Sequence, residues 1–316
     1  MIDFSTRLKC PACGDTRFSS IWSGRFSDPA VRSMLDRFFY STDLEESLGD
    51  QVFSLVTCNG CEFRFHSRVI TDEWVPAVYG EWISREQIEA FEAAHVSRPL
   101  DSFDERLSGL RFLMRLHRLA TANGSHQDGL SLLDFGCGDG RLIALARALG
   151  ITAFGVDISG SRMQVADAHG CIVFSTMDAL LAAVKSPFQI VILNQVLEHV
   201  RDPDAVLKAL ARCMAPEGIL FVGVPNCWGI GSPRSFEEFH SVQPIEHINC
   251  FTPSSLKSFV ETRGFVQVRR PQAFVTTNVI KAIKSMAGVV IQKASTDQYF
   301  KRTTTDLGFG KVSTQT

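Results

Sequence analysis

The stretch that decides the fold is "LLDFGCGDGRL", which spans residues 132–142. Its two leucines continue an apolar run that is typical of a buried strand, and the run ends in Asp134. Glycines follow at three alternate positions, where a tight turn lets the backbone approach a ligand closely: Gly136, Gly138 and Gly140. The residues after them have the apolar spacing of a helix. The stretch therefore predicts a strand, a glycine-rich turn and a helix, the local structure of a nucleotide-type binding loop.

Short apolar segments alternate with helical segments along the chain after residue 130. The predicted strands are 131–135, 152–157, 171–174, 188–194 and 218–224, and the helices between them are 140–149, 160–169, 177–184 and 203–213. A further helix is predicted to begin with Thr252 as its cap and Pro253 in its first turn. Two final strands are predicted in "GFVQVRR" (264–270) and "FVTTNVI" (274–280). The predicted fold class is therefore α/β, a doubly wound and mainly parallel sheet of seven strands.

Three kinds of ligand are candidates for the glycine-rich loop, and spacing separates them. A P-loop requires Lys and then Ser or Thr after its last glycine, whereas Arg141 and Leu142 stand there. A dinucleotide fingerprint has the spacing G-x-G-x-x-G, whereas this loop has G-x-G-x-G, and the carboxylates of Asp134 and Asp139 would repel a pyrophosphate. A ligand with a cationic amine and a sulfonium but no phosphate fits better, and S-adenosylmethionine has these groups.

On these residues the chain resembles the class I S-adenosylmethionine-dependent methyltransferases over roughly residues 130–270, with "LLDFGCGDGRL" as the family's first motif. The resemblance implies a Rossmann-like class I methyltransferase fold and S-adenosylmethionine as cofactor. It implies that Asp157, in "FGVDIS", binds the ribose hydroxyls and that Asp178, in "FSTMDAL", holds the adenine amino group, with a helix cap as the alternative role of Asp178. The expected cofactor-binding residues are Asp134, Gly136, Gly138, Gly140, Asp157, Ile158, Asp178 and Asn194.

Two further stretches that resemble segments of this family carry candidate catalytic residues. "VILNQVLEHV" contains Glu198 and His199, and "PIEHINCF" contains Glu246 and His247, a few residues after His240. Methyl transfer from a sulfonium is an in-line displacement, so the enzyme mainly aligns donor and acceptor and excludes water. A base helps where the acceptor carries a proton. The predicted catalytic residues are His247, His240 and Glu246, and a scaffold role for each histidine stays open.

Four of the nine cysteines form two C-x-x-C pairs, in "CPACG" and "CNGC". Each pair places two sulfur atoms on one tight turn, so the two pairs can converge on one tetrahedral Zn(II) ion. The 44 residues between the pairs include a segment that looks helical, residues 29–40. The predicted ligands of a structural zinc site are Cys10, Cys13, Cys58 and Cys61, and the alternative is four unmetallated, small apolar side chains. Glu62 stands where such turns usually carry a glycine.

The composition and charge of the chain limit which partners and which cellular location are expected for the protein. The formal net charge of −2, with no block of Lys and Arg, gives no general attraction to nucleic acid or to an anionic membrane. The N-terminus lacks the apolar core of a signal peptide, and the longest apolar stretches are far too short to cross a bilayer. A cytoplasmic location without membrane contact is therefore expected, and the sequence leaves the oligomeric state open.

The expected organisation has four parts. They are a zinc-ribbon-like module (1–73), a helical connector or lid (74–125), the S-adenosylmethionine-binding methyltransferase domain (126–292) and a poorly ordered polar tail (293–316). The combination resembles zinc-bearing methyltransferases that act on nucleotide-linked sugars and specialised metabolites, which predicts a small-molecule acceptor. One alternative is an RNA methyltransferase that uses the zinc module for recognition, but "NQVL" replaces the Asn/Asp-Pro-Pro-aromatic motif of base-amine methylation. The other is a non-catalytic binding protein with this fold.

Overall fold

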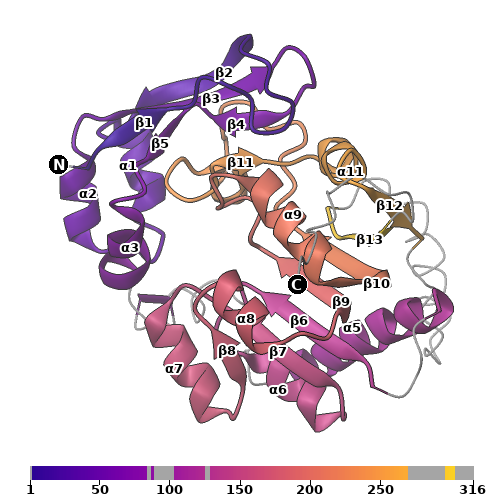
Figure 1. Cartoon of the computed structure of the whole chain (residues 1–316). Helices are drawn as coiled ribbons and strands as arrows, with labels where there is room; N and C mark the ends of the chain where they lie inside the picture. The colour runs from indigo at the N-terminus through magenta and orange to yellow at the C-terminus, as the bar shows by residue number, and fades with distance from the viewer. Residues whose placement is uncertain (1, 84–86, 89–102, 125–128, 270–295, 303–316) are drawn as a thin grey trace, which may run out of the picture.

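The structure, a computed structural model, describes residues 2–83, 87–88, 103–124, 129–269 and 296–302 (Figure 1). Its largest sheet has seven strands in the order β12-β13-β10-β9-β6-β7-β8. The neighbouring strands β10, β9, β6, β7 and β8 are parallel to one another. Strand β13 is antiparallel to both of its neighbours, β10 and β12. The strands are β6 (Ser131–Phe135), β7 (Thr152–Val156), β8 (Ile172–Phe174), β9 (Phe188–Asn194), β10 (Met214–Gly223), β12 (Phe265–Val268) and β13 (Gln298–Arg302). The predicted α/β class with a mainly parallel seven-stranded sheet is confirmed.

Both faces of this sheet are buried, because successive side chains of a strand point to opposite sides. Leu132 belongs to one hydrophobic cluster and Leu133 to the other. The helices on the Leu132 side are α5 (Phe103–Ala122), α6 (Arg141–Ala148) and α7 (Gly160–Ala168). Those on the Leu133 side are α8 (Met177–Ala183), α9 (Pro203–Cys213) and α11 (Pro253–Glu261). Helix α11 begins as predicted, with Thr252 as its cap and Pro253 in its first turn.

The strand next to β10 corrects one expectation about the end of the chain. The predicted strand 274–280 lies outside the described residues, whereas β13 falls in the segment that was expected to be a poorly ordered polar tail. Tyr299 and Phe300 of β13 are 1% and 0% exposed, and they pack on opposite faces of the sheet. Two adjacent aromatic residues with polar neighbours are a weak sequence signal for a buried strand. In the structure, however, one ring packs on each face of the sheet, so both sides of the strand are buried.

The N-terminal part forms a smaller antiparallel sheet with the order β11-β4-β3-β2. The bounds are β2 (Phe18–Arg25), β3 (Val52–Cys58), β4 (Arg64–His66) and β11 (Asn249–Cys250), with a separate pair of β1 (Phe4–Thr6) and β5 (Arg68–Ile70). The helices are α1 (Pro29–Leu35), α2 (Thr42–Leu48), α3 (Val75–Ala77) and a π-helix, η1 (Val78–Trp82). We refer to residues 2–83 as the N-terminal module. Because β11 comes from far along the chain, this sheet joins the module to the larger domain (Figure 1).

Two arginines fasten the N-terminal module to the loops beyond the large sheet. Arg7 donates to the carbonyl oxygens of Ile248 and Arg201 at 3.1 and 2.8 Å. Arg201 in turn donates to Ser5 Oγ at 2.8 Å and to the carbonyl oxygen of Ile70. Burial lowers the pKa of the Arg7 guanidinium to about 10.

In the described ranges, no helix has both the length and the apolar character required to cross a membrane.

Candidate active site

The glycine-rich loop has the backbone that its sequence predicted. Gly136, Gly138 and Gly140 have φ angles of +80°, +54° and +71°, which residues with a side chain rarely adopt. A Cβ at Gly136 would lie 2.4 Å from Val196 Cγ2, so the loop packs against the turn that follows β9. Gly140 is buried, and a Cβ there would lie 2.9 Å from Ala166 Cβ. Gly140 is therefore required for packing α6 against α7, a role that the prediction of ligand contact missed.

Asp157, at the end of β7, ties the loop to the next strand. Its Oδ2 accepts a hydrogen bond from the Gly138 N–H at 2.8 Å, and its Oδ1 accepts one from the Ser159 N–H at 2.8 Å. A carboxylate oxygen can accept a second bond, so both oxygens remain able to bind hydroxyls of a ribose. The neighbouring Ile158 is 68% exposed and offers apolar surface beside them. These features fit a nucleoside ligand.

The remaining predicted cofactor residues lie at the same edge of the sheet, where the parallel strands end. Asp134 is buried at the end of β6, and burial, followed by the nearby Asp157 carboxylate, raises its pKa to about 7. A bound ammonium or sulfonium would favour the charged form of this carboxyl. Asn194 is exposed at the end of β9. Asp178 is also exposed, and the cap of α8 is Thr176, so the alternative of Asp178 as the cap is wrong.

A buried polar cluster lies beyond the ends of β9 and β10. His199 and His247 have ring centroids 4.9 Å apart, and those of His240 and His247 are 5.3 Å apart. Burial lowers the pKa of all three imidazoles: below the usual value for His240, to about 4 for His199, and well below the usual value for His247. They are therefore neutral at neutral pH. The structure thus brings His199 together with His240 and His247, which lie about 40 residues later in one stretch of the chain.

Glu246 is the member of this cluster whose protonation state is best matched to neutral pH. Burial raises its pKa to about 7, against opposing contributions from Tyr40, Arg162 and Tyr79. Tyr40 donates a hydrogen bond to Glu246 Oε2 at 2.5 Å. Such a carboxyl can exchange a proton near neutral pH, as a general base must.

Residues of the N-terminal module complete the cluster. The Tyr79 hydroxyl lies 3.3 Å from His199 Nδ1, and the Phe38 ring stacks on His240 at 5.5 Å between centroids. The sequence analysis missed Tyr40, Tyr79 and Phe38, because no motif marks them and their segments are distant in sequence. One weak signal exists: the chain has only three tyrosines, and two of them contact this cluster.

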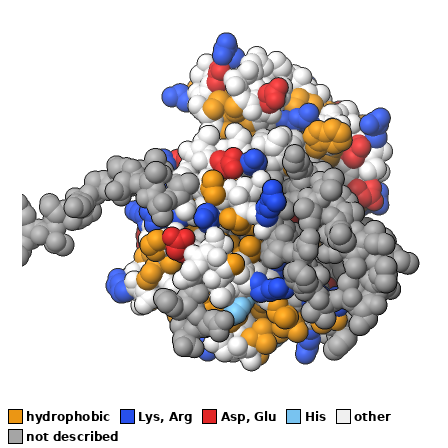
Figure 2. All heavy atoms as spheres, turned by 90° about the vertical axis from the view of Figure 1, so that its right-hand side faces the viewer, with side chains coloured by type: hydrophobic (Ala, Val, Ile, Leu, Met, Phe, Trp, Pro, Cys, Tyr) orange, Lys and Arg blue, Asp and Glu red, His pale blue; other side chains and the backbone are white. Residues whose placement is uncertain are grey.

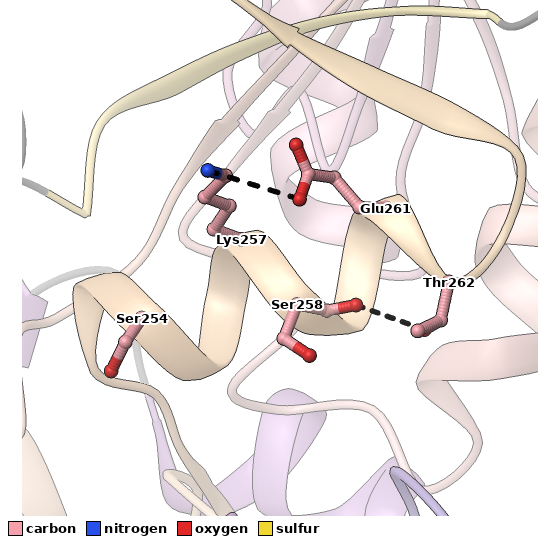
Figure 3. A pocket seen from close by; sticks show the side chains of 5 residues that line it. All are labelled: Ser254, Lys257, Ser258, Glu261 and Thr262. Carbon is pink, nitrogen blue, oxygen red and sulfur yellow. Dashed lines mark hydrogen bonds and ion pairs between the residues drawn. The ribbon is translucent and has the colours of Figure 1, made fainter.

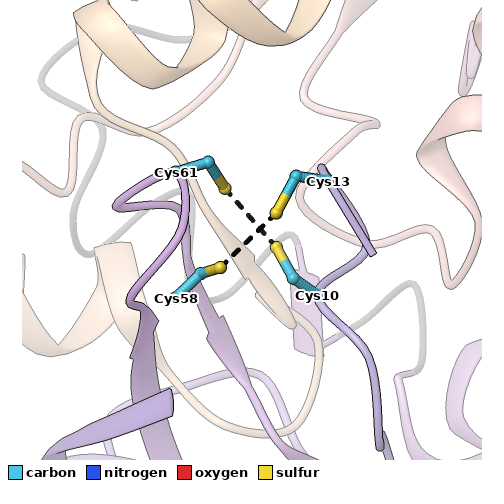
Figure 4. A group of neighbouring side chains, drawn as sticks. All are labelled: Cys10, Cys13, Cys58 and Cys61. Carbon is cyan, nitrogen blue, oxygen red and sulfur yellow. Dashed lines mark hydrogen bonds between the residues drawn. The ribbon is translucent and has the colours of Figure 1, made fainter. Parts of the chain in front are cut away.

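The four predicted zinc ligands converge in the N-terminal module, with their sulfur atoms pointing toward a common centre (Figure 4). The Sγ atoms of Cys10 and Cys61 are 3.7 Å apart, and those of Cys13 and Cys58 are 3.5 Å apart. Bonds of about 2.3 Å to a tetrahedral zinc ion would place sulfur atoms about 3.8 Å apart. The N–H groups of Ala12 and Gly60 point at Cys10 Sγ and Cys58 Sγ, each at 3.4 Å. The arrangement fits Zn(II).

The two cysteine turns match in backbone conformation although their sequences differ. Gly14 and Glu62 each follow the second cysteine of a pair, and their φ angles are +81° and +59°. Their N–H groups donate to the carbonyl oxygens of Cys10 and Cys58, both at 2.9 Å. Glu62 therefore adopts a left-handed conformation that favours glycine.

A comparison with known families decides the identity of the larger domain. The family described as "Methyltransferase domain" matches residues 103–269, which is more than half of the chain. The chain belongs to this methyltransferase family. The match begins with α5 and ends just after β12, so it includes both the glycine-rich loop and the histidine cluster of this methyltransferase.

Relatives of this methyltransferase include ubiquinone biosynthesis O-methyltransferases. That of Caulobacter sp. (strain K31) is 37% identical over 106 residues, which cover 31% of this chain and 42% of the relative. That of Caulobacter vibrioides (strain ATCC 19089 / CIP 103742 / CB 15) is 34% identical over 145 residues, which cover 43% and 55%. The chain spans about half the length of these curated relatives.

Two solved structures with similar folds are named as methyltransferases. The plantazolicin methyltransferase BamL, solved with SAH, is 13% identical with a TM-score of 0.46, covering 69% of this chain and 91% of its own. An S-adenosylmethionine-dependent methyltransferase from Archaeoglobus fulgidus is 21% identical with a TM-score of 0.35, covering 63% and 95%.

One pocket of this methyltransferase lies away from both sites, on the outer side of α11 (Figure 3). It is lined by Ser254, Lys257, Ser258, Glu261 and Thr262. Lys257 pairs with Glu261 at 3.9 Å, and Thr262 donates to the carbonyl oxygen of Ser258 at 2.9 Å. Because these groups partner one another within a single helix, the pocket has no convergent polar groups for a ligand.

Proposed function

We propose that the protein transfers the methyl group of S-adenosylmethionine to a small-molecule acceptor bound between the N-terminal module and the methyltransferase domain. The observation that carries this proposal is the composite cluster, in which Tyr40 of the module donates to Glu246 of the domain and Tyr79 contacts His199. A buried site built by both parts can surround a small molecule and exclude water.

Arg162 links the proposed donor and acceptor sites. Its Nη1 would lie 3.5 Å from a Cβ at Gly138, in the glycine-rich loop. Its charge also lowers the pKa values of Glu246 and His199 in the buried cluster. The nearness of Arg162 to both proposed sites supports their proximity, which direct methyl transfer requires.

The donor would bind through the residues at the strand ends. Asp157 would hold the ribose hydroxyls, Ile158 would pack on the adenine, and Asp134 would face the cationic amino acid part, with Asp178 and Asn194 at the margins. When bound, S-adenosylmethionine supplies a methyl group on a positively charged sulfur. The protein's own contribution is to align the two substrates, to exclude water and to take up a proton.

The acceptor is proposed to be a hydroxyl oxygen, as the name O-methyltransferase of the relatives suggests. The oxygen forms a bond to the methyl carbon, the carbon–sulfur bond breaks with its electron pair on sulfur, and the hydroxyl proton passes to Glu246. Neutral His247 and His240 accept hydrogen bonds from the acceptor; His247 is the second candidate for the base. A sugar or a specialised metabolite fits this description.

A labelled-methyl assay tests this proposal. We expect transfer from S-adenosylmethionine to hydroxylated small molecules, and a loss of about 100-fold in turnover in Glu246→Gln with donor affinity retained. Glu237→Gln, the same change at an exposed position of helix α10 (Phe236–Val242), is the matched control. No donor binding by calorimetry would contradict the proposal and favour the non-catalytic alternative.

The RNA alternative receives no support from the visible surface. In Figure 2, side chains of Lys and Arg are interspersed with acidic and hydrophobic ones on the coloured part of this face, without a continuous basic stripe. RNA-binding methyltransferases need such an electrostatic footprint. Binding to RNA that weakens steeply as the salt concentration rises would support the RNA alternative.

We also propose that the four cysteines bind a structural zinc ion that stabilises residues 1–73 as a zinc-ribbon-like module. Helix α5 packs on the large sheet, so we propose that the donor-binding domain begins near residue 103 and not near residue 126. Metal analysis of the purified protein is expected to find zinc that Cys61→Ser loses and that the scattered-cysteine variant Cys171→Ser keeps. Zinc content unchanged in Cys61→Ser would contradict the assignment.

A further inference from the structure

Glu198 has a carboxylate that nothing in the proposed function uses. The side chain is 1% exposed, and neither oxygen has a hydrogen-bond partner among the described residues. A buried carboxylate is costly unless it is paired. The buried Glu198 carboxyl group therefore requires either a bound proton or a neighbouring cation.

Two imidazoles face this carboxylate. One ring nitrogen of His199, one of His247 and a carboxylate oxygen of Glu198 all lie within 4.8 Å of one another. His199 Nε2 is 3.8 Å from Glu198 Oε1, too far for a direct hydrogen bond. His247 is 6% exposed, and its Nδ1 also has no partner among the described residues. Three ligand-type groups thus converge without satisfying one another.

The surroundings hold these groups in a suitable state. The Tyr79 hydroxyl contacts His199 Nδ1 at 3.3 Å, which turns the other nitrogen toward Glu198. Histidines that bind metals usually have their second nitrogen held in this way. A neutral imidazole has a lone pair on one ring nitrogen, which is the atom that binds a metal ion. The segment is also anchored, since Asn249 donates from its side chain to the carbonyl oxygens of Leu197 and Val200 at 2.8 and 2.7 Å.

We infer that Glu198, His199 and His247 bind a divalent transition-metal ion, at a site separate from the four cysteines. Two imidazoles and one carboxylate suit Zn(II), Fe(II) or Mn(II). Bonds of about 2.0 to 2.2 Å would bring the ligand atoms to about 3 to 3.5 Å from one another, so small side-chain rotations close the site on binding.

With the metal ion bound, His247 would be a ligand and Glu246 would remain the candidate base. Three protein ligands leave coordination positions open to an oxygen of the acceptor. A metal ion lowers the pKa of a bound hydroxyl, which makes its oxygen a better nucleophile. This role rests on the proposed function, whereas metal binding by the three residues does not. The inference narrows the acceptor to molecules whose hydroxyl oxygen can coordinate a metal ion.

Titration of the metal-free whole protein with Co(II) tests the site. Sulfur-to-cobalt charge-transfer absorption reports the cysteines, so a second equivalent that adds none of it reports the new site. We expect two equivalents in the wild type and one in both Glu198→Gln and His247→Gln. His240→Gln, a change of a neighbouring histidine outside the triad, should keep two.

A single equivalent in the wild type would overturn the inference, and this result does not depend on whether any variant folds. Two equivalents in both triad variants, with folding verified by circular dichroism, would overturn it as well. Donor calorimetry on the same samples separates the two proposals. Donor binding and methyl transfer without a second metal ion reject the metal site alone, whereas a second metal ion without donor binding rejects the proposed function.

Discussion

The Tyr40 hydroxyl donates a hydrogen bond to Glu246 Oε2 at 2.5 Å, between residues that are 206 positions apart in sequence. Burial and the Glu246 carboxylate raise the pKa of Tyr40 well above its usual value, so the phenol stays protonated and remains a donor. Glu246 is therefore the member of the pair that gains and loses a proton. One contact between the two parts of the protein thus controls the protonation of the proposed base.

Replacing Tyr40 by Phe should shift the pH dependence of turnover. Tyr40 lowers the pKa of Glu246, so Tyr40→Phe raises it and moves the rising limb of the rate profile to higher pH. A net hydrogen-bond contribution of about 1 kcal/mol corresponds to a rise of about 0.7 pKa unit, which predicts a loss of about threefold in turnover at pH 7 and of about fivefold well below it. The measurement is turnover against pH, with Tyr299→Phe, whose hydroxyl contacts Arg115, as control. An unchanged profile in Tyr40→Phe would exclude the coupling.

The contribution of Glu246 to stability should fall as the pH rises through neutrality. The pKa of Glu246 is about 7 in the folded state against 4.5 in the unfolded state, so the folded state binds more protons between these values. The stabilisation is complete below about pH 4.5 and is lost as the pH rises through 7, by about 3 kcal/mol at most. Urea unfolding at several pH values should show a smaller decline in Glu246→Gln than in the wild type. An equal decline would mean that Glu246 titrates normally.

Replacing Glu62 by Gly should stabilise the cysteine turn. The φ angle of +59° strains a residue that has a Cβ, and glycine relieves this strain. We expect the free energy of unfolding to rise by about 1 kcal/mol in urea titrations. Glu62→Ala separates backbone strain from charge, because alanine keeps the Cβ and should give no such gain. Equal gains from both changes would show that the carboxylate, and not the backbone, is unfavourable.

Replacing Asp157 by Ala should weaken donor binding strongly. The change removes the acceptor for the Gly138 and Ser159 N–H groups and for the ribose hydroxyls. Two lost charge-assisted hydrogen bonds predict a decrease of about 100-fold or more in affinity for S-adenosylmethionine. Calorimetry measures it, and Asp167→Ala, an exposed change on α7, is the control. Retained affinity in Asp157→Ala would remove the ribose assignment.

The sequence predicted the elements whose signals are local. The apolar run 188–194 has the same bounds as β9, and Thr252 with Pro253 begins α11 as predicted. Features that depend on distant partners were missed. Strand β13 carries little local signal, and its burial comes from the neighbours that β10 and β12 supply.

The residues of the candidate site also fall into those that local sequence predicts and those that depend on distant partners. The acidic and glycine positions of the donor loop follow directly from a strand, a turn and a helix. Tyr40 and Tyr79 reach the cluster only because the N-terminal module packs against the domain, which no spacing within the sequence encodes. The roles of His240 and His247 likewise depend on burial that the sequence does not report.

Strand β11 begins two residues after His247, and it pairs with β4 through Asn249 and Phe65. The wall of the acceptor site and the edge of the module's sheet are therefore one continuous stretch of backbone. A rigid-body motion of the module would therefore also displace His247. In evolution, exchange of the module would require a matching change of the strand on which it docks.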